Sequence, residues 1–217
     1  MSKLKVALFD LDGVIIDTEN QYSHFWGTIG KEYHPDVPDF AERIKGTTLI
    51  SIYTNWFAHL QDKLPEITQR LNEFESQMEY NYIRGAREFI ITLKKAGIHT
   101  AIVTASDEEK MQRVLAIHPE FTDMFDYILT SKDYTTGKPA PDCYLKGAEI
   151  FEASPRECVV FEDSINGLHA GRESGAYVVA LTTTNSYAVV SALANLVIND
   201  LSELTLPTLL QQFEQQR

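Results

Sequence analysis

The chain alternates short apolar runs with longer amphipathic segments. The short runs are rich in Val, Ile, Leu and Phe, as strands buried on both faces of a sheet are. The predicted strands are 5–9, 98–103, 127–129, 158–161 and 177–181, with a possible edge strand at 196–198. Helical patterning fills the intervals at 86–96, 108–117, 141–151 and 166–174. Short strands that alternate with helices predict a parallel sheet with helices on both faces.

One interval is much longer than the others. Roughly seventy residues without a strand pattern separate the first predicted strand from Gly85, and an apolar stripe over 66–82 predicts a helix among them. This interval is too long for an ordinary crossover and too regularly patterned for a loop. We therefore expect an α/β protein with a Rossmann-like core formed by 1–16 and 85–217. A small all-helical cap domain at 17–84 would be inserted after the first strand.

The composition is that of an ordinary globular protein. Of 217 residues, 44% are hydrophobic and 23% charged, which suffices for a sizeable core without disulfides. Two cysteines, and an N-terminal apolar run too short for a signal sequence, favour a cytoplasmic location. No stretch is long and apolar enough to span a membrane. A formal net charge of −12 argues against nucleic-acid and anionic-membrane partners, and no obligate protein partner is predicted.

Polar clusters stand where the predicted strands end. Ligands of an open parallel sheet bind beyond the carboxyl ends of its strands, so residues at those ends should meet in one crevice. Three clusters follow strands, and a fourth lies shortly before one. They occupy positions 10–13, 104–106, 162–164 and 137–139.

The carboxylates of these clusters suit phosphoryl transfer. Asp10 and Asp163 follow separate strands and offer the hard oxygen ligands that Mg²⁺ prefers. A carboxylate such as Asp10 can also attack phosphorus and form an aspartyl-phosphate. Asp12, two residues further on, can return to the same side of the chain and protonate the leaving oxygen. Gly13 allows a sharp turn or a close approach of the backbone.

The remaining groups suit the oxygens of a phosphoryl group. The hydroxyl of Thr104, the backbone amides near Ala105 and Ser106, and the charge of Lys138 can hold the transferred oxygens. Each cluster alone has a simpler interpretation: an Asp-x-Asp turn, a plain loop, or a helix cap at 104 or at 162–164. Their occurrence in order, each at a predicted strand end or just before a strand, favours a catalytic site.

Together the four clusters resemble the four motifs of the haloacid dehalogenase superfamily, and the helical insert resembles its type-one cap. The chain is most similar to the subgroup that contains β-phosphoglucomutase and many sugar-phosphate phosphatases. The resemblance spans nearly the whole chain. It implies that Asp10 is both nucleophile and metal ligand. It also implies that Asp12 is the acid/base and offers the metal its backbone carbonyl.

The same resemblance assigns the other motif residues. Thr104 and Lys138 would bind phosphate, and Asp163 would ligate the metal, with Glu162 beside it directly or through water. The founding dehalogenases lack the second aspartate of the first motif. Because Asp12 is present here, the resemblance implies phosphoryl transfer rather than carbon–halogen cleavage.

The cap residues bear on which phosphoryl transfer is carried out. Caps like that of β-phosphoglucomutase carry a His four residues before a Trp, and an Arg three residues after a Gly. Here Tyr22 precedes Trp26, and Leu49 follows Gly46. Without that Arg a sugar bisphosphate loses a phosphate clamp, so a phosphatase acting on a small phosphorylated metabolite ranks above a mutase. An inorganic pyrophosphatase and a catalytically silent phosphate-binding module stay as alternatives.

The polar loop at 45–48 is the predicted substrate contact of the cap. Lys45 and Thr47 could close over the crevice and touch the leaving group, although Lys45 could equally be a solvated charge at a helix end. A set of aromatic residues is expected to form the core of the cap rather than a sugar-stacking platform. These residues are Tyr22, Phe25, Trp26, Trp56 and Phe57.

Overall fold

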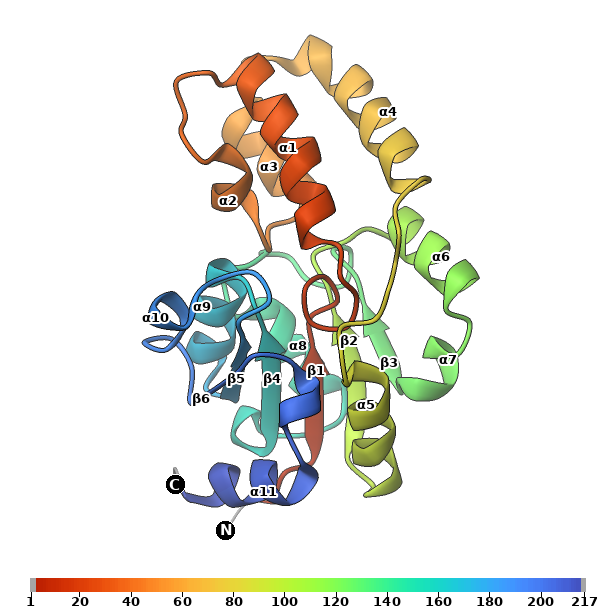
Figure 1. The fold of residues 1–217 in the computed structure, drawn as a ribbon, viewed down its shortest axis with the longest axis vertical. Coiled ribbons are helices and arrows are strands. Elements are labelled where there is room, and N and C mark those ends of the chain that lie inside the picture. Colours follow the sequence, from red (N-terminus) through yellow and green to blue (C-terminus); the bar gives the residue numbers. More distant parts are fainter. Residues whose placement is uncertain (1–2, 216–217) are drawn as a thin grey trace.

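The computed structural model describes residues 3–215 and contains a six-stranded parallel sheet (Figure 1). The strand order is β3-β2-β1-β4-β5-β6, with every neighbouring pair parallel. The strands are β1 Val6–Phe9, β2 His99–Val103, β3 Tyr127–Leu129, β4 Cys158–Glu162, β5 Tyr177–Leu181 and β6 Leu196–Ile198. The α/β prediction is confirmed, and each predicted strand exists to within one residue at either end.

Alternating side chains along the strands build two separate cores. Ala7 and Phe9 of β1 face one apolar cluster, while Val6 and Leu8 face the other. Helices cover both faces, as the continuous apolar runs predicted. On the first face lie α5 Ala86–Lys95, α6 Glu108–Ile117, α7 Phe121–Met124 and α11 Leu206–Gln215. On the second lie α8 Asp142–Ile150, α9 Ile165–Ser174 and α10 Tyr187–Val190.

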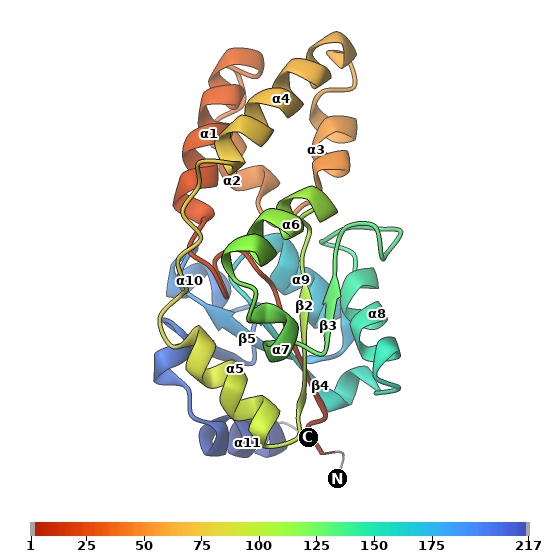
Figure 2. The same cartoon turned by 90° about the vertical axis from the view of Figure 1, so that its right-hand side faces the viewer.

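The segment between β1 and α5 forms a helical layer above the carboxyl ends of the strands (Figures 1 and 2). It contains α1 Glu19–Tyr33, α2 Phe40–Ile44, α3 Leu49–Trp56 and α4 Leu64–Glu75. These helices pack around their own apolar cluster, which includes Phe25, Trp26 and Phe57, with Tyr22 and Trp56 against it. The aromatic set of the sequence analysis therefore forms a core. Within the described residues, no helix has the length and apolar character that crossing a membrane requires.

The helix predicted over 66–82 is wrong in its second half. The helix α4 ends at Glu75, and a turn at Ser76 and Gln77 follows. Met78 and Tyr82 continue the apolar spacing, but Met78 packs into the core beside the sheet and Tyr82 packs against it, rather than into the cluster of the helical layer. Apolar residues continue at similar intervals past the end of α4 because the chain passes there from the cluster of the helical layer to the core beside the sheet.

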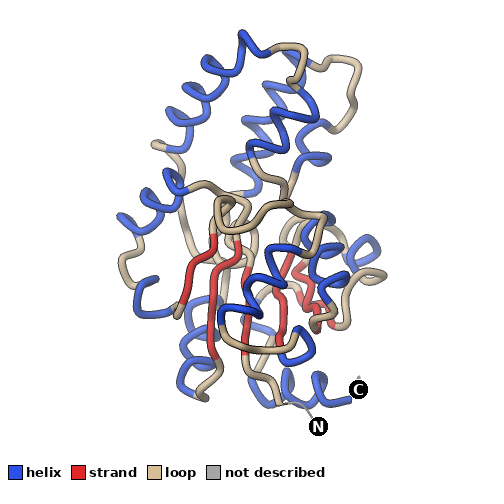
Figure 3. The backbone as a smooth tube through the Cα atoms, turned by 180° about the vertical axis from the view of Figure 1, so that it is seen from behind, coloured by secondary structure: helices blue, strands red, loops and turns tan. Residues whose placement is uncertain are grey.

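Two connecting segments, one before α1 and one after α4, join the helical layer to the sheet. They run side by side, because the Asp17 amide donates to the Asn81 carbonyl at 2.8 Å and Ile16 forms a bridge with Tyr82. Seen from behind, the strands end beneath the helical layer (Figure 3). The polar residues at the strand ends therefore face the helices of the insert.

Candidate active site

Asp10 lies directly after β1, with its backbone amide bonded to the Phe161 carbonyl at 3.0 Å. Its side chain is buried, and its Oδ1 accepts a hydrogen bond from Lys138 Nζ at 2.7 Å. Burial raises the pKa of Asp10 to about 7, and Glu162 and Asp12 add to this, while Lys138 opposes it. A cation beside Asp10 would favour the ionised form, which is the nucleophilic one.

Lys138 joins two of the predicted clusters. Besides Asp10 it donates to Glu162 Oε1 at 2.6 Å, and it is fully buried. Burial alone would lower the pKa of Lys138, but Asp10 and Glu162 outweigh it and raise that pKa well above its ordinary value. Lys138 therefore carries a fixed positive charge at the carboxyl end of β1 and β4.

Glu162 reaches the same cluster but has both oxygens engaged by protein groups. Its Oε1 accepts from Lys138 and from the Tyr144 hydroxyl at 2.8 Å. Its Oε2 accepts from the backbone amides of Asp163 and Ser164 at 3.0 and 3.1 Å. This carboxylate is therefore placed to orient Lys138 and the turn after β4 more directly than to bind a metal itself.

The groups that could hold a metal ion are brought together. One oxygen each of Asp10, Glu162 and Asp163 lies within 4.8 Å of the others. Asp163 is buried, and its Oδ1 has no hydrogen-bond partner among residues 3–215, an unusual state for a buried carboxylate. Burial and the neighbouring Glu19, Glu162 and Asp10 raise the pKa of Asp163 well above its usual range. These oxygen donors fit a hard divalent cation.

Gly13 lies against this cluster for a geometric reason. Its φ of +73° is in the left-handed region, and a Cβ at this position would collide with the Asp163 carboxylate. Thr183 donates to the Gly13 carbonyl at 2.6 Å, and the Thr184 hydroxyl donates to Asp163 Oδ2. The turn after β1 can therefore approach Asp163 only because residue 13 has no side chain.

Asp12 is held by three donors. Lys110 Nζ lies 2.7 and 2.5 Å from its two oxygens, and the Ser106 hydroxyl donates to Oδ2 at 3.2 Å. The Thr18 hydroxyl donates to Oδ1. Lys110 is itself buried, and its ammonium lies 4.4 Å from the centre of the Tyr22 ring. The carboxylate of Asp12 is thus fixed at the boundary between the sheet and the helical insert.

The segment after β2 faces the same space. Thr104 is buried, and its hydroxyl accepts from the Ser106 amide at 3.0 Å. Thr104, Ala105 and Ser106 line a cavity together with Asp10 and Asp12. The loop residues Lys45 and Thr47 line it from the insert. Lys45 is mostly enclosed and lies 2.9 Å from Glu42, so it is not a solvated charge.

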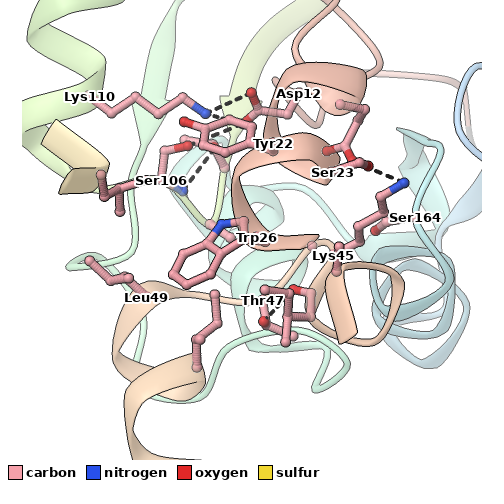
Figure 4. Close-up of a pocket in the computed structure, with 18 of the residues that line it drawn as sticks. Asp12, Tyr22, Ser23, Trp26, Lys45, Thr47, Leu49, Ser106, Lys110 and Ser164 are labelled. Carbon is pink, nitrogen blue, oxygen red and sulfur yellow. Dashed lines mark hydrogen bonds and ion pairs between the residues drawn. The ribbon is translucent and has the colours of Figure 1, made fainter. Parts of the chain in front are cut away.

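The cavity lies between the strand ends and the helical layer, and it has a volume of about 110 Å³. Figure 4 shows Lys110 directed at Asp12 beside the Tyr22 ring, with Trp26, Leu49 and Thr47 around the same space. Carboxylates and hydroxyls gather at its sheet side, and apolar side chains form much of its roof. The arrangement can hold an anionic group against Asp10 and enclose the group attached to it.

Comparison with known proteins gives the family. A family model described as haloacid dehalogenase-like hydrolase matches residues 7–181. The chain belongs to the haloacid dehalogenase-like hydrolase family. Its family relatives include validoxylamine A 7'-phosphate phosphatase of Streptomyces hygroscopicus subsp. limoneus, 26% identical over 94% of this chain and 97% of the relative. β-Phosphoglucomutase of Bacillus subtilis is 29% identical over 99% of this chain and 97% of the relative.

Solved structures of family members agree. A haloacid dehalogenase hydrolase of family IA, variant 3, from Entamoeba histolytica superposes with a TM-score of 0.81 at 25% identity, over 97% of this chain and 99% of that one. β-Phosphoglucomutase from Clostridium difficile also gives a TM-score of 0.81, at 22% identity, over 98% of both chains. At that identity the second comparison supports the fold alone.

Several residues of this family member's site escaped the sequence analysis. Lys110 lies four residues before Val114, on the buried face of α6, but a lysine at the start of a helix gives no sign that its ammonium group is enclosed. Glu19 and Glu75 line the cavity from α1 and α4. Burial, with Asp12 next in effect, raises the pKa of Glu19 to about 8. The sequence does not show that Lys110, Glu19 and Glu75 line a cavity, because they meet only after the insert folds over the sheet.

Proposed function

We propose that the protein is a Mg²⁺-dependent phosphatase that hydrolyses a small phosphorylated metabolite, such as a sugar phosphate-like monoester, through an aspartyl-phosphate on Asp10. One observation carries the proposal. The Asp10 carboxylate is held 2.7 Å from the buried Lys138 ammonium and shares a cluster of oxygens with Asp163. Phosphatases among the relatives support the reaction class.

Each residue has a part in the two chemical steps. Asp10 attacks phosphorus while Asp12 gives a proton to the departing alcohol, and Asp12 then takes a proton from the water that releases phosphate. Lys138, Thr104 and the amides of Ala105 and Ser106 hold the phosphoryl oxygens. A Mg²⁺ ion held by Asp10, Asp163 and the Asp12 carbonyl would offset the repulsion between the anionic nucleophile and the anionic phosphoryl group.

We propose that 17–84 acts as a cap over a core made of 1–16 and 85–217. The helices of this segment have an apolar cluster of their own and contribute the roof of the cavity. A cap that moves on its two connecting chains would admit substrate and then exclude water during the reaction. Lys45 and Thr47 would contact the leaving group from this side.

A phosphosugar mutase is the closest rival. Relatives named β-phosphoglucomutase share the fold and about the same identity. Leu49 and Tyr22 argue for hydrolysis: Leu49 lines the cavity with an apolar side chain, and the Tyr22 hydroxyl already donates to Glu75 at 2.7 Å. Neither residue offers a cation to a second phosphate.

The test is phosphate release from a panel of phosphorylated metabolites and p-nitrophenyl phosphate with Mg²⁺. The wild type should release phosphate, and Asp10→Asn should lose activity while it keeps the circular dichroism spectrum of the fold. Supplying β-glucose 1-phosphate with its bisphosphate activator separates the rival, since a mutase yields glucose 6-phosphate. Wild-type hydrolysis by Asp10→Asn would remove that residue from its role. Inactivity of the wild type on every ester would favour a silent binding module.

A further inference from the structure

The half of the cavity that receives the leaving group, away from Asp10, offers few cations. Two ammonium groups, Lys45 and Lys110, line the cavity, beside carboxyl groups that include Glu75 and Asp107. An anion carried by the leaving group would need a cation that is free to receive it.

Lys110 is not free in this sense. Its ammonium contacts both oxygens of Asp12, at 2.7 and 2.5 Å, and it lies over the Tyr22 ring. Both partners, Asp12 and Tyr22, also line the cavity. Turning Lys110 toward an anionic substituent of the substrate would break a buried ion pair and leave Asp12 without its counter-charge, which is strongly unfavourable.

The other nearby cations are also engaged. Lys45 Nζ lies 2.9 Å from Glu42 and 3.7 Å from Glu19. Arg113, just behind the cavity wall, contacts Glu75 at 2.7 Å and Glu109 at 2.5 Å. Each of these positive charges is thus matched by carboxylates of the same chain. Neither Lys45 nor Lys110 is therefore free to receive an anion.

The rest of this half is apolar. Trp26 and Leu71 face it from α1 and α4, and Ile52 and Leu49 face it from α3. Apolar walls lower the local dielectric constant, so a bound anion without a counter-charge is less stable here than in water. The engaged cations and the walls therefore act in the same direction.

We propose that the phosphate ester hydrolysed here releases an alcohol that carries no negative charge. The substrate class is the monophosphate of a neutral alcohol, to the exclusion of bisphosphates, diphosphates and phosphorylated acids. This rests on the proposed phosphatase function and narrows it. The selectivity is set by Glu75 and its neighbours in the cap-facing half, not by the groups that bind the transferred phosphoryl group.

The test compares two esters of the same shape, 4-carbamoylphenyl phosphate and 4-carboxyphenyl phosphate, with phenyl phosphate as the reference. We expect kcat/KM for the neutral amide to exceed that for the carboxylate by on the order of tenfold or more. Glu75→Gln keeps an acceptor for Tyr22 and removes one pocket charge, so it should reduce that ratio severalfold. Glu73→Gln, an equal change on the exposed face of the same helix, should leave the ratio unchanged.

The outcomes distinguish failure of the substrate selectivity from failure of the phosphatase function. Equal turnover of the amide and carboxylate esters, in an enzyme that hydrolyses phenyl phosphate well, overturns the selectivity and leaves the phosphatase function intact. A ratio that Glu75→Gln and Glu73→Gln change equally overturns the role given to the cavity charge. Failure to hydrolyse phenyl phosphate at all refutes the phosphatase function, and the inference with it.

Discussion

Lys110→Met replaces the cation that holds Asp12 with an apolar side chain of similar length. In the structure the Lys110 ammonium contacts both oxygens of Asp12, and the side chain is 5% exposed. After the substitution the partners of Asp12 among residues 3–215 are the neutral hydroxyls of Thr18 and Ser106. We expect its carboxyl group to lose the fixed orientation that proton transfer to the leaving oxygen requires.

The size of the effect follows from the lost contacts. A hydrogen bond to a charged group contributes about 1.5–3 kcal/mol net, and the pair is mostly shielded from water. If that amount is lost from the transition state, kcat/KM falls by about 10- to 150-fold, at 1.36 kcal/mol for each factor of ten. The loss should be greatest for an alkyl phosphate, whose leaving oxygen needs the proton. It should be smaller for p-nitrophenyl phosphate, whose leaving group departs as a stable anion.

The assay is kcat/KM for both esters in wild type, Lys110→Met and Lys110→Arg. The arginine variant keeps the charge and should recover part of the activity. Lys132→Met is the matched control, because Lys132 forms an exposed ion pair with Glu108 that contributes little. The reasoning is refuted if the alkyl and aryl esters lose activity equally, or if Lys110→Met behaves like Lys132→Met.

Three further predictions concern the carboxylate cluster at the strand ends and the helical insert. The pKa of Asp10 in the folded protein, about 7, exceeds its ordinary value of 3.8, so the folded protein binds a proton that the unfolded chain releases. In EDTA the thermal midpoint should therefore fall as pH rises from about 4 to about 7. Asp10→Asn should show a smaller fall in differential scanning fluorimetry, and an identical fall would contradict the assignment. Gly13→Ala should lower activity on the order of 100-fold, because the new methyl group displaces Asp163. Gly97 has a similar φ of +76°, but a Cβ built there has no atom within 4 Å, so Gly97→Ala should keep full activity. Equal losses in the two variants would exclude the collision with Asp163 as the cause. Leu49→Arg should raise phosphate release from glucose 1,6-bisphosphate relative to glucose 6-phosphate by on the order of tenfold, and an unchanged ratio would show that position 49 does not face the substrate.

The sequence was most informative where local pattern and chemistry coincide. Continuous apolar runs of four or five residues predicted β1, β4 and β5, because a strand buried on both faces has no polar alternation to obscure it. The apolar run of β2 is shorter, at Ala101 to Val103. The polar clusters at their ends could be grouped because all parallel strands point the same way. Asp10 and Asp163 lie in one cluster for that reason, and Lys138 reaches Asp10 from the loop before α8.

The rest depends on tertiary packing. Lys110 is one of several charged residues along α6, and its contact with Asp12 exists only because α6 starts beside the turn after β1. Glu75 likewise ends α4 as a buried acid. Its position four residues after Leu71 places it on the apolar face, but the spacing does not show that this face continues past the cluster of the helical layer to the cavity. The end of α4 was missed because apolar spacing continued into a different core. Such contacts form between elements, so no window of sequence contains them.

The identity of the nucleophile can be measured directly. Asp12→Asn should accept a phosphoryl group but release it slowly, so acid quenching during turnover of p-nitrophenyl phosphate should trap a covalent adduct. Tandem mass spectrometry of the peptide from the N-terminal region should then locate one phosphoryl group on Asp10. A phosphoryl group on Thr104 or Ser106, or steady turnover with no adduct, would contradict the account.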